Sequence, residues 1–387
     1  MKKGLALVLS LILVISLFAG CAKVDGNTPS GSGEAGNNGE KKVKVACMLN
    51  GLLGDKGLLD SAADGVRRAE KDFDNLEVKV IEAGYDASKW EATLEDLSSQ
   101  DYDVIITGLF SMREYVEKTA PKYPEVKYIV FDTTPDYEKY DLKNVHSITY
   151  KQNEGAFLAG YIAARMSQTN AIGAVGGDDS EVINDFMTGY EESDLPLVNK
   201  NSNTFSVVGG VDSPVINDFV VGYIQGAKYV NPEITVLNAY IASVSDAPKC
   251  KDVSLQMYAQ NSNVNFSPSG GAVMGSMDAA KEAGRYVIGV DADQCQQFLE
   301  TDPEMANLVI SSAIKNVGQS LYLALGRYLK NEIPWGSGEV MGLEDGTVGL
   351  AKNEIYEKVV PQDIKDRLDE IEKKISNGEI VVRSSFS

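Results

Sequence analysis

Two apolar runs decide the fold class of this chain: YDVIITGLF (residues 102–110) and VKYIVFDTT (residues 126–134). Both are rich in β-branched and aromatic residues, and neither alternates apolar with polar positions. Such continuous runs are typical of strands buried on both faces of a parallel sheet. A more polar segment separates the two runs, so the pattern is strand, helix, strand.

The same alternation extends in both directions along the chain. Helical spacing of apolar residues is found in SAADGVRRAEKDF (residues 61–73) and EGAFLAGYIAARMS (residues 154–167). Further strands are expected at KVKVACML (42–49), LEVKVIEA (76–83), AIGAVGG (171–177), FSVVGG (205–210), ITVLNAYIA (234–242), NVNFSPSGG (263–271) and RYVIGVDAD (285–293). This alternation predicts an α/β fold with parallel sheets. The strands are too many for one ordinary sheet, so we expect two lobes.

The C-terminal region predicts an amphipathic helix followed by a strand. Pro361 marks the helix start, an apolar face repeats from Ile364 to Ile375, and Gly378 ends the helix. The residues EIVV (379–382) then predict a terminal strand.

The middle of the chain contains a tandem duplication. VGGDDSEVINDFMTGY (residues 175–190) recurs as VGGVDSPVINDFVVGY (residues 208–223), 33 residues later, with 12 of 16 positions identical. One interpretation is a pair of equivalent binding loops. The other, which we favour, is a copied strand–helix unit within residues 170–235, with the second copy in the sheet and the first forming an insertion.

The N-terminus predicts export and lipidation. A basic start, a short apolar core and small residues make residues 1–20 a signal peptide. The stretch FAGC (residues 18–21) resembles the lipobox of bacterial lipoproteins, in which the cysteine, here Cys21, carries the lipid; the alternative is an ordinary signal peptide with an incidental cysteine. Residues 21–42 are too polar to order themselves and predict a flexible tether.

Composition argues against several classes of function. The formal net charge of −20 makes the chain a poor partner for nucleic acid. Cys47, Cys250 and Cys295 are widely spaced and suggest neither a disulfide framework nor a zinc site. The single histidine, His146, has no nucleophile motif near it, so we expect a structural or surface role for it.

Polar residues that follow the predicted strands are the candidates for ligand binding, because ligands of open α/β sheets bind beyond the carboxyl ends of strands. Asp55 and Lys56 follow the first strand, and Asp132 follows another. Asp291 and Lys315 form an attractive pair, since a carboxylate accepts hydrogen bonds from hydroxyls and an ammonium donates them. The pair suits a polyol such as ribose.

At this point the sequence resembles a known family. GDKGLLDSAADGV (54–66), NEGAFLAGYIAA (153–164), VGGVDSPVINDFVVGYIQGAKYVNP (208–232), SGGAVMGSMDAAKEAGRYVIGVDADQ (269–294) and SAIKNVGQSLY (312–322) together look like the basic membrane protein family. These proteins are the substrate-binding lipoproteins of ABC importers and include purine nucleoside receptors. The resemblance runs from about residue 43 to the end.

The resemblance implies the type I periplasmic-binding-protein fold, with two Rossmann-like lobes joined by a three-crossing hinge. We expect the first lobe to comprise residues 43–147 and about 314–333. The second would comprise residues 148–313 and 334–387.

The resemblance also implies residue roles. Asp132, Gly270, Asp291 and Lys315 match family positions, the last two resembling ribose contacts, and Asn50 lies near a base-contacting position. The family places a stacking Phe and a bonding Asn where this chain has Leu58 and Leu59, and a second Phe where it has Val244. Each stacking face is worth roughly 1–3 kcal/mol, so weaker nucleoside binding is expected.

We therefore expect a lipid-anchored, extracytoplasmic binding protein that closes on a nucleoside-like ligand and delivers it to an ABC permease. We expect a monomer with no cofactor, no metal and no enzymatic activity. The alternative is a ligand-sensing or adhesive surface lipoprotein that feeds no transporter. With one histidine and no nucleophile motif, a secreted enzyme is the least supported class.

Overall fold

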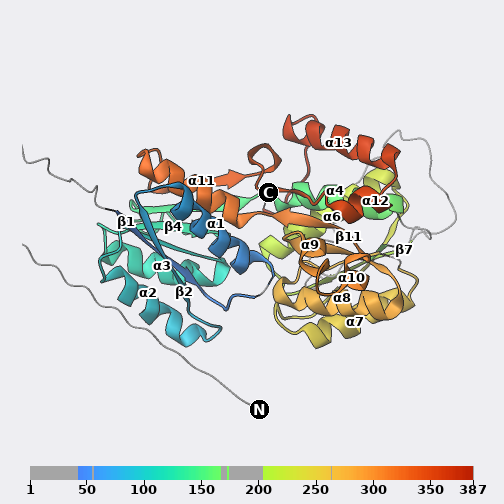
Figure 1. Ribbon diagram of the computed structural model, residues 1–387, viewed down its shortest axis with the longest axis horizontal. Coiled ribbons are helices and arrows are strands. Elements are labelled where there is room, and N and C mark those ends of the chain that lie inside the picture. The colour runs from blue at the N-terminus through green and yellow to red at the C-terminus, as the bar shows by residue number, and fades with distance from the viewer. Residues whose placement is uncertain (1–41, 55, 167–171, 174–203, 263, 387) are drawn as a thin grey trace, which may run out of the picture. The chain divides into compact units, whose positions relative to one another are not determined.

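The computed structural model describes residues 42–54, 56–166, 172–173, 204–262 and 264–386, which contain two sheets (Figure 1). The first sheet has six strands in the order β12-β5-β4-β3-β1-β2, and every pairing in it is parallel. The strands are β1 (Val43–Leu49), β2 (Leu76–Glu82), β3 (Val104–Gly108), β4 (Lys127–Phe131), β5 (Val145–Tyr150) and β12 (Ser337–Met341). The two runs that indicated a parallel sheet are thus β3 and β4, which are neighbours.

Helices cover both faces of the first sheet (Figure 1). The elements are α1 (Leu58–Asp72), η1 (Ala87–Lys89), α2 (Trp90–Ser98), η2 (Phe110–Met112), α3 (Arg113–Thr119), η3 (Ala120–Lys122) and α11 (Val317–Leu329). Alternate side chains of β1 point to opposite faces: Cys47 packs in the cluster with α1 and α11, and Met48 in the cluster with α2 and α3. Two covered faces explain why β1 is apolar and buried from Val45 to Leu49, after Lys44 near its start.

The second sheet has seven strands in the order β13-β11-β10-β9-β6-β7-β8. All pairings are parallel except that of β13 with β11, which is antiparallel. The strands are β6 (Ile172–Gly173), β7 (Thr204–Gly209), β8 (Thr235–Tyr240), β9 (Val264–Phe266), β10 (Tyr286–Asp291), β11 (Val309–Lys315) and β13 (Val348–Leu350).

Glycines bring the helices of the second sheet into close contact. A Cβ atom on Gly226 of α6 would overlap the carbonyl oxygen of Phe157 in α4, and one on Gly160 of α4 would overlap that of Tyr223. The helical elements here are α4 (Gln152–Met166), α6 (Pro214–Val230), α7 (Ala247–Ala259), η4 (Gly270–Ala272), α8 (Val273–Ala283), α9 (Gln294–Phe298), α10 (Pro303–Ala306), η5 (Leu343–Asp345), α12 (Glu354–Val359) and α13 (Gln362–Ser376).

The second copy of the duplication supplies the end of β7 and most of α6, which begins with a Ser213 cap and Pro214. It therefore belongs to the seven-stranded sheet and its helical cover. The first copy lies outside the described residues.

In the described part of the chain, three connections pass between the two sheets: from β5 to α4, from β11 to α11, and from β12 to β13. The expected lobe boundaries stay a prediction as domain limits, but the strand pairing differs from them at each junction. β5 continues past residue 147 to Tyr150 in the six-stranded sheet, and β11 reaches Lys315 in the seven-stranded sheet. The third difference is the largest. Residues 334–387 were expected in the second lobe, whereas β12 pairs with β5 in the six-stranded sheet. The third crossing therefore follows Met341.

The C-terminal helix is confirmed, but the predicted terminal strand is wrong. Successive turns of α13 are buried through Ile364, Leu368, Ile371 and Ile375. Residues 379–382 form no strand, because the backbone of this segment binds side chains and not a neighbouring strand. The amide of Asn153 donates to the carbonyl oxygens of Val382 and Arg383 at 3.0 and 3.2 Å.

Candidate ligand-binding site

A cavity of about 300 Å³ lies among loops that follow strands of both sheets. We call it the strand-end cavity. The residues predicted for ligand binding that line it are Asn50, Leu58, Leu59, Asp132, Val244, Gly270, Asp291 and Lys315. Lys56 is not among its lining residues, and Asp55 lies outside the described residues.

Sheet topology explains why these residues meet. Asn50 directly follows β1 and Asp132 directly follows β4, while Asp291 and Lys315 are the last residues of β10 and β11. Parallel strands bring their carboxyl ends to one edge of a sheet, and the ligands of such sheets bind there. The cavity therefore collects residues that are far apart in the sequence but occupy equivalent places in the fold.

A buried ionic cluster joins the two sheets within the cavity. The Lys315 ammonium donates to both carboxylate oxygens of Asp132 at 3.0 Å, and its Nζ lies 3.7 Å from Oδ1 of Asp291. The exposed fractions of Lys315, Asp132 and Asp291 are 2%, 5% and 8%. Burial disfavours the charged lysine, but the two carboxylates outweigh it and hold the pKa of Lys315 above its usual range. Sequence reasoning paired Lys315 with Asp291, whereas Asp132 is the nearer partner.

The backbone around the cavity is unusual. Leu109, Asp132 and Asp291 have φ values of 66°, 57° and 65°, in the left-handed region that residues other than glycine seldom occupy. All three follow or end strands and all line the cavity. Non-glycine residues held in this region cluster at ligand-binding and active sites, because the surrounding structure must compensate the strain.

Lys56 is held away from the cavity by its own loop. Its backbone nitrogen donates to Asp60 at 2.9 Å, and its carbonyl oxygen accepts a hydrogen bond from Gln297 of α9 at 2.6 Å. Its Nζ lies 4.9 Å from the centre of the Phe298 ring. Lys56 thus connects the loop after β1 to α9 of the second sheet.

Sequence reasoning missed four aromatic residues that line the cavity, namely Tyr85, Trp90, Phe110 and Phe219. Tyr85 and Phe110 follow β2 and β3, so the strand-end rule that selected Asp132 would also have found them. The start of α6 contributes further lining through Ser213, Val215 and Ile216, which the sequence reasoning also missed.

The remaining reactive side chains lie elsewhere. His146 is fully buried between the carbonyl oxygen of Ser337 and the carboxylate of Glu339, each 3.1 Å from a ring nitrogen. Cys47, Cys250 and Cys295 are free and buried. Within the described ranges, no three side chains of the metal-binding types form a group that could hold an ion.

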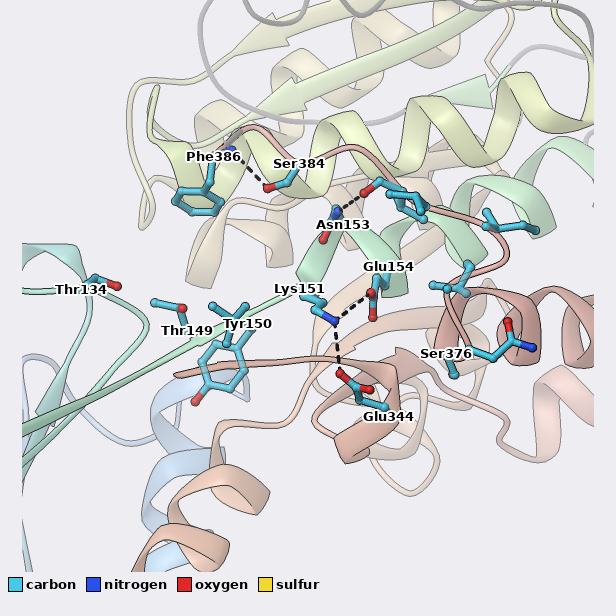
Figure 2. A pocket seen from close by; sticks show the side chains of 17 residues that line it. Thr134, Thr149, Tyr150, Lys151, Asn153, Glu154, Glu344, Ser376, Ser384 and Phe386 are labelled. Atoms are coloured by element: carbon cyan, nitrogen blue, oxygen red, sulfur yellow. Dashed lines mark hydrogen bonds and ion pairs between the residues drawn. The ribbon is translucent and has the colours of Figure 1, made fainter. Parts of the chain in front are cut away.

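A larger cavity of about 740 Å³ lies beside the C-terminal segment, and we call it the tail groove. Figure 2 shows Lys151 in its wall pointing toward Glu154 and Glu344, with Nζ–Oε1 distances of 3.6 and 3.3 Å. None of the predicted ligand-binding residues lines the tail groove. The strand-end cavity, with its buried charges, is therefore the candidate site despite its smaller volume.

The fold is that of the solute-binding proteins of ABC transporters. A solute-binding protein of Aeropyrum pernix K1 has a TM-score of 0.69 at 24% identity, covering 88% of this chain and 94% of that one. A solute-binding protein from Conexibacter woesei has a TM-score of 0.66 at 18% identity, covering 89% of this chain and all of that one. At these identities the likeness establishes the fold alone.

The sequence comparison identifies the family. The model described as "ABC transporter substrate-binding protein PnrA-like" matches residues 42–192 and 198–385. Basic membrane protein A2 of Borrelia garinii subsp. bavariensis is 30% identical over 343 residues, which is 88% of each chain. The chain belongs to this family of substrate-binding proteins, so the resemblance inferred from the motifs is confirmed.

Family membership defines the general role. The chain is an extracytoplasmic substrate-binding protein that binds a small molecule and delivers it to an ABC permease, and it is not an enzyme. The structure adds that no helix in the part of the chain it describes is long and apolar enough to cross a bilayer.

Proposed function

We propose that the chain is a lipid-anchored receptor for a nucleoside-like ligand, which binds in the strand-end cavity. The observation that carries the proposal is the buried cluster of Lys315, Asp132 and Asp291, which joins strand ends of both sheets. An ammonium flanked by two carboxylates supplies donors and acceptors within a few ångströms. That combination suits adjacent hydroxyl groups, each of which both donates and accepts.

The rest of the cavity suits the flat, less polar part of such a ligand. Leu58, Leu59 and Val244 contribute aliphatic surface. Asn50 is 4% exposed and donates from Nδ2 to Ser111 at 2.8 Å, so its amide has a fixed orientation beside the cavity. A fixed amide selects among base edges by hydrogen bonding.

Binding would be coupled to closure of the two lobes. A ligand held by Asp132 on one sheet and by Asp291 and Lys315 on the other makes its full set of contacts only when the sheets are close. Such a ligand shifts the population toward the closed arrangement by its differential affinity. The closed complex, acting as a monomer anchored through Cys21, would then be the form that the permease recognises.

The test is isothermal titration of the purified protein with adenosine, guanosine, inosine, uridine and ribose. We expect at least one nucleoside to bind, and Asp291→Asn to weaken that binding roughly 10- to 150-fold, since hydrogen bonds to charged groups contribute about 1.5–3 kcal/mol. Asn tolerates the left-handed backbone at this position, so the fold should survive.

The matched control is Asp363→Asn, on α13 and outside the cavity, where the aspartate side chain is 70% exposed. It should bind as the unchanged protein does. Absence of heat with every nucleoside and with ribose would remove this ligand class, and equal affinities in the two variants would remove Asp291 from the site.

A further inference from the structure

We propose that Tyr85 and Phe110 form an aromatic lip that stacks against the planar ring of the ligand; this inference rests on the proposed function. Both residues line the strand-end cavity, from the loops after β2 and β3. Their exposed fractions are 63% and 53%. A single exposed apolar side chain is ordinary. Two exposed aromatic rings beside one cavity, each on a backbone fixed by hydrogen bonds, instead suggest that the rings contact a ligand.

The backbone that carries Tyr85 is fixed by three hydrogen bonds. Ala83 N donates to Leu49 O at 2.8 Å and Gly84 N donates to Gly51 O at 3.2 Å. The indole of Trp90 donates to Gly84 O at 2.8 Å. These bonds tie the loop after β2 to the end of β1, so Tyr85 is held beside the loop that carries Asn50.

The space around Gly51 shows how closely the Tyr85 ring approaches that loop. A Cβ atom added to Gly51 would lie 3.0 Å from Cε1 of Tyr85 and 2.5 Å from Cδ1 of Leu59. The Tyr85 ring therefore lies directly beside Gly51, and a side chain there would press against it. It extends the surface that Leu59 and Asn50 offer to the cavity.

Phe110 is positioned by the left-handed residue that precedes it. Leu109 has a φ of 66°, its backbone nitrogen donates to Phe131 O at 2.9 Å, and its carbonyl oxygen accepts from Met112 N at 3.0 Å. The residue after Phe110 is also tied, because Ser111 accepts the hydrogen bond from the Asn50 amide. Phe110 is thus carried by a segment bonded on both sides.

The other two aromatic residues of the cavity are already engaged. Trp90 is 9% exposed and packs edge-on against Tyr115, with ring centres 6.4 Å apart. Phe219 is 2% exposed, and Lys315 Nζ lies 5.3 Å from its ring centre. Among the ring pairs of the described residues, none includes Tyr85 or Phe110. These two rings are therefore not stacked on another ring of the described residues, and both are more than half exposed.

The aromatic lip offsets the weaker nucleoside affinity that the sequence predicts. The positions from which the family is expected to stack hold Leu58 and Val244, which suggests a loss of aromatic contact. Tyr85 and Phe110 supply aromatic surface to the same cavity from two other loops of the first sheet. The cavity thereby keeps its preference for a flat ring although the stacking residues come from different strands.

The test compares nucleoside and ribose binding by isothermal titration in Tyr85→Ala, Phe110→Ala and Tyr85→Phe. Loss of one stacking ring should weaken nucleoside binding about 5- to 150-fold. Ribose, which has no base, should bind all variants equally, and Tyr85→Phe should keep the nucleoside affinity. The control is Phe386→Ala, a phenylalanine of similar exposure (56%) that lines the tail groove.

The outcomes separate this inference from the proposed function. Nucleoside binding that both alanine variants leave intact overturns the lip while the nucleoside site stands. Ribose binding without any gain from an attached base overturns the lip while the hydroxyl-binding cluster stands. Absence of binding by nucleosides, free purine bases and ribose overturns both. A loss in the alanine variants that Phe386→Ala shares equally also overturns the lip.

Discussion

Lys315 lies between two buried carboxylates, so its charge matters for folding as well as for binding. Lys315→Met keeps the length of the side chain but leaves Asp132 and Asp291 without their cation. Removing one partner of a buried pair typically costs about 3–5 kcal/mol. We expect a loss of that order in the free energy of unfolding, measured by urea denaturation at pH 7. Adding Asp132→Asn should restore part of it.

The matched control for this prediction is Lys352→Met. Lys352 also contacts two carboxylates, at 2.8 and 2.6 Å, but its side chain is 35% exposed. A partly solvated pair should contribute about 1 kcal/mol or less. Equal losses in the free energy of unfolding of the two lysine variants, or no recovery in the double variant, would contradict the prediction. Burial would then not make Lys315 more important for stability than Lys352.

At the residue scale, the sequence identified polar residues that directly follow or end a predicted strand, because ligands of open α/β sheets bind at those positions. Asp132, Asp291 and Lys315 were candidates because each follows or ends an apolar run, and only Asp291 and Lys315 were expected to act as a pair. All three line the cavity. Lys56, also a candidate, does not line the cavity: its backbone is left-handed (φ 50°), and its carbonyl oxygen accepts a hydrogen bond from Gln297 of α9, a turn that sequence does not reveal. Tyr85 and Phe110 were missed because attention was on polar residues.

The C-terminal segment is held to α6 by a buried carboxylate. Asp218 is 1% exposed and accepts hydrogen bonds from Ser384 Oγ at 2.7 Å, Ser385 N at 2.9 Å and Asn153 N at 3.3 Å. Burial outweighs these donors and raises the pKa of Asp218 to about 6. The segment is thus anchored through a group that titrates in a mildly acidic range.

This element predicts a specific dependence of stability on pH. The folded state holds a proton on Asp218 up to about pH 6, whereas in the unfolded chain the aspartate has its ordinary pKa of 3.8 and releases the proton there. The free energy of unfolding should therefore fall as pH rises between these values, by up to about 3 kcal/mol from this group. Urea denaturation at several pH values should show the slope in the unchanged protein and a flatter one in Asp218→Asn. Parallel profiles would contradict it.

Helices and strands whose apolar face packs against another element could be predicted from the sequence. Residues 379–382, which have no such face, could not. β3 and the part of β4 after Lys127 are buried because helices cover both faces of their sheet. The apolar residues of α13 repeat with helical spacing because one face packs on the core. The residues EIVV have the composition of a strand, but they pair with no strand, and the carbonyl oxygen of Val382 accepts a hydrogen bond from the Asn153 amide. Tertiary partners, not propensity, decide such short segments.

At the scale of the whole molecule, the lipid anchor is the prediction that fixes where the protein works. Cys21 lies outside the described residues. We expect Cys21→Ala to abolish incorporation of labelled palmitate and to move the protein from the membrane fraction to the soluble fraction, with nucleoside binding unchanged. Ser30→Ala, in the same tether, should keep the label. Label in the Cys21 variant, or none in the unchanged protein, would contradict lipidation.

The presence of two sheets could be predicted by counting the apolar runs, but the residues at which the chain crosses from one sheet to the other could not. The number of apolar runs required two sheets, and the family motifs implied three crossings. The position of the third crossing was misjudged because β12 reads, in sequence, like the start of the last segment. Its pairing with β5 depends on α11 having already returned the chain to the first sheet.

The three crossings have a consequence for anyone who wishes to divide the protein. A gene fragment that ends after β5 at Tyr150 encodes five of the six strands but omits Val317, Leu321 and Leu325 of α11, which complete one face of the core. Such a fragment would leave the apolar face that α11 normally covers exposed to water. Cleavage between β11 and α11, in contrast, leaves two pieces that each contribute strands to both sheets, so a molecule nicked there should stay assembled.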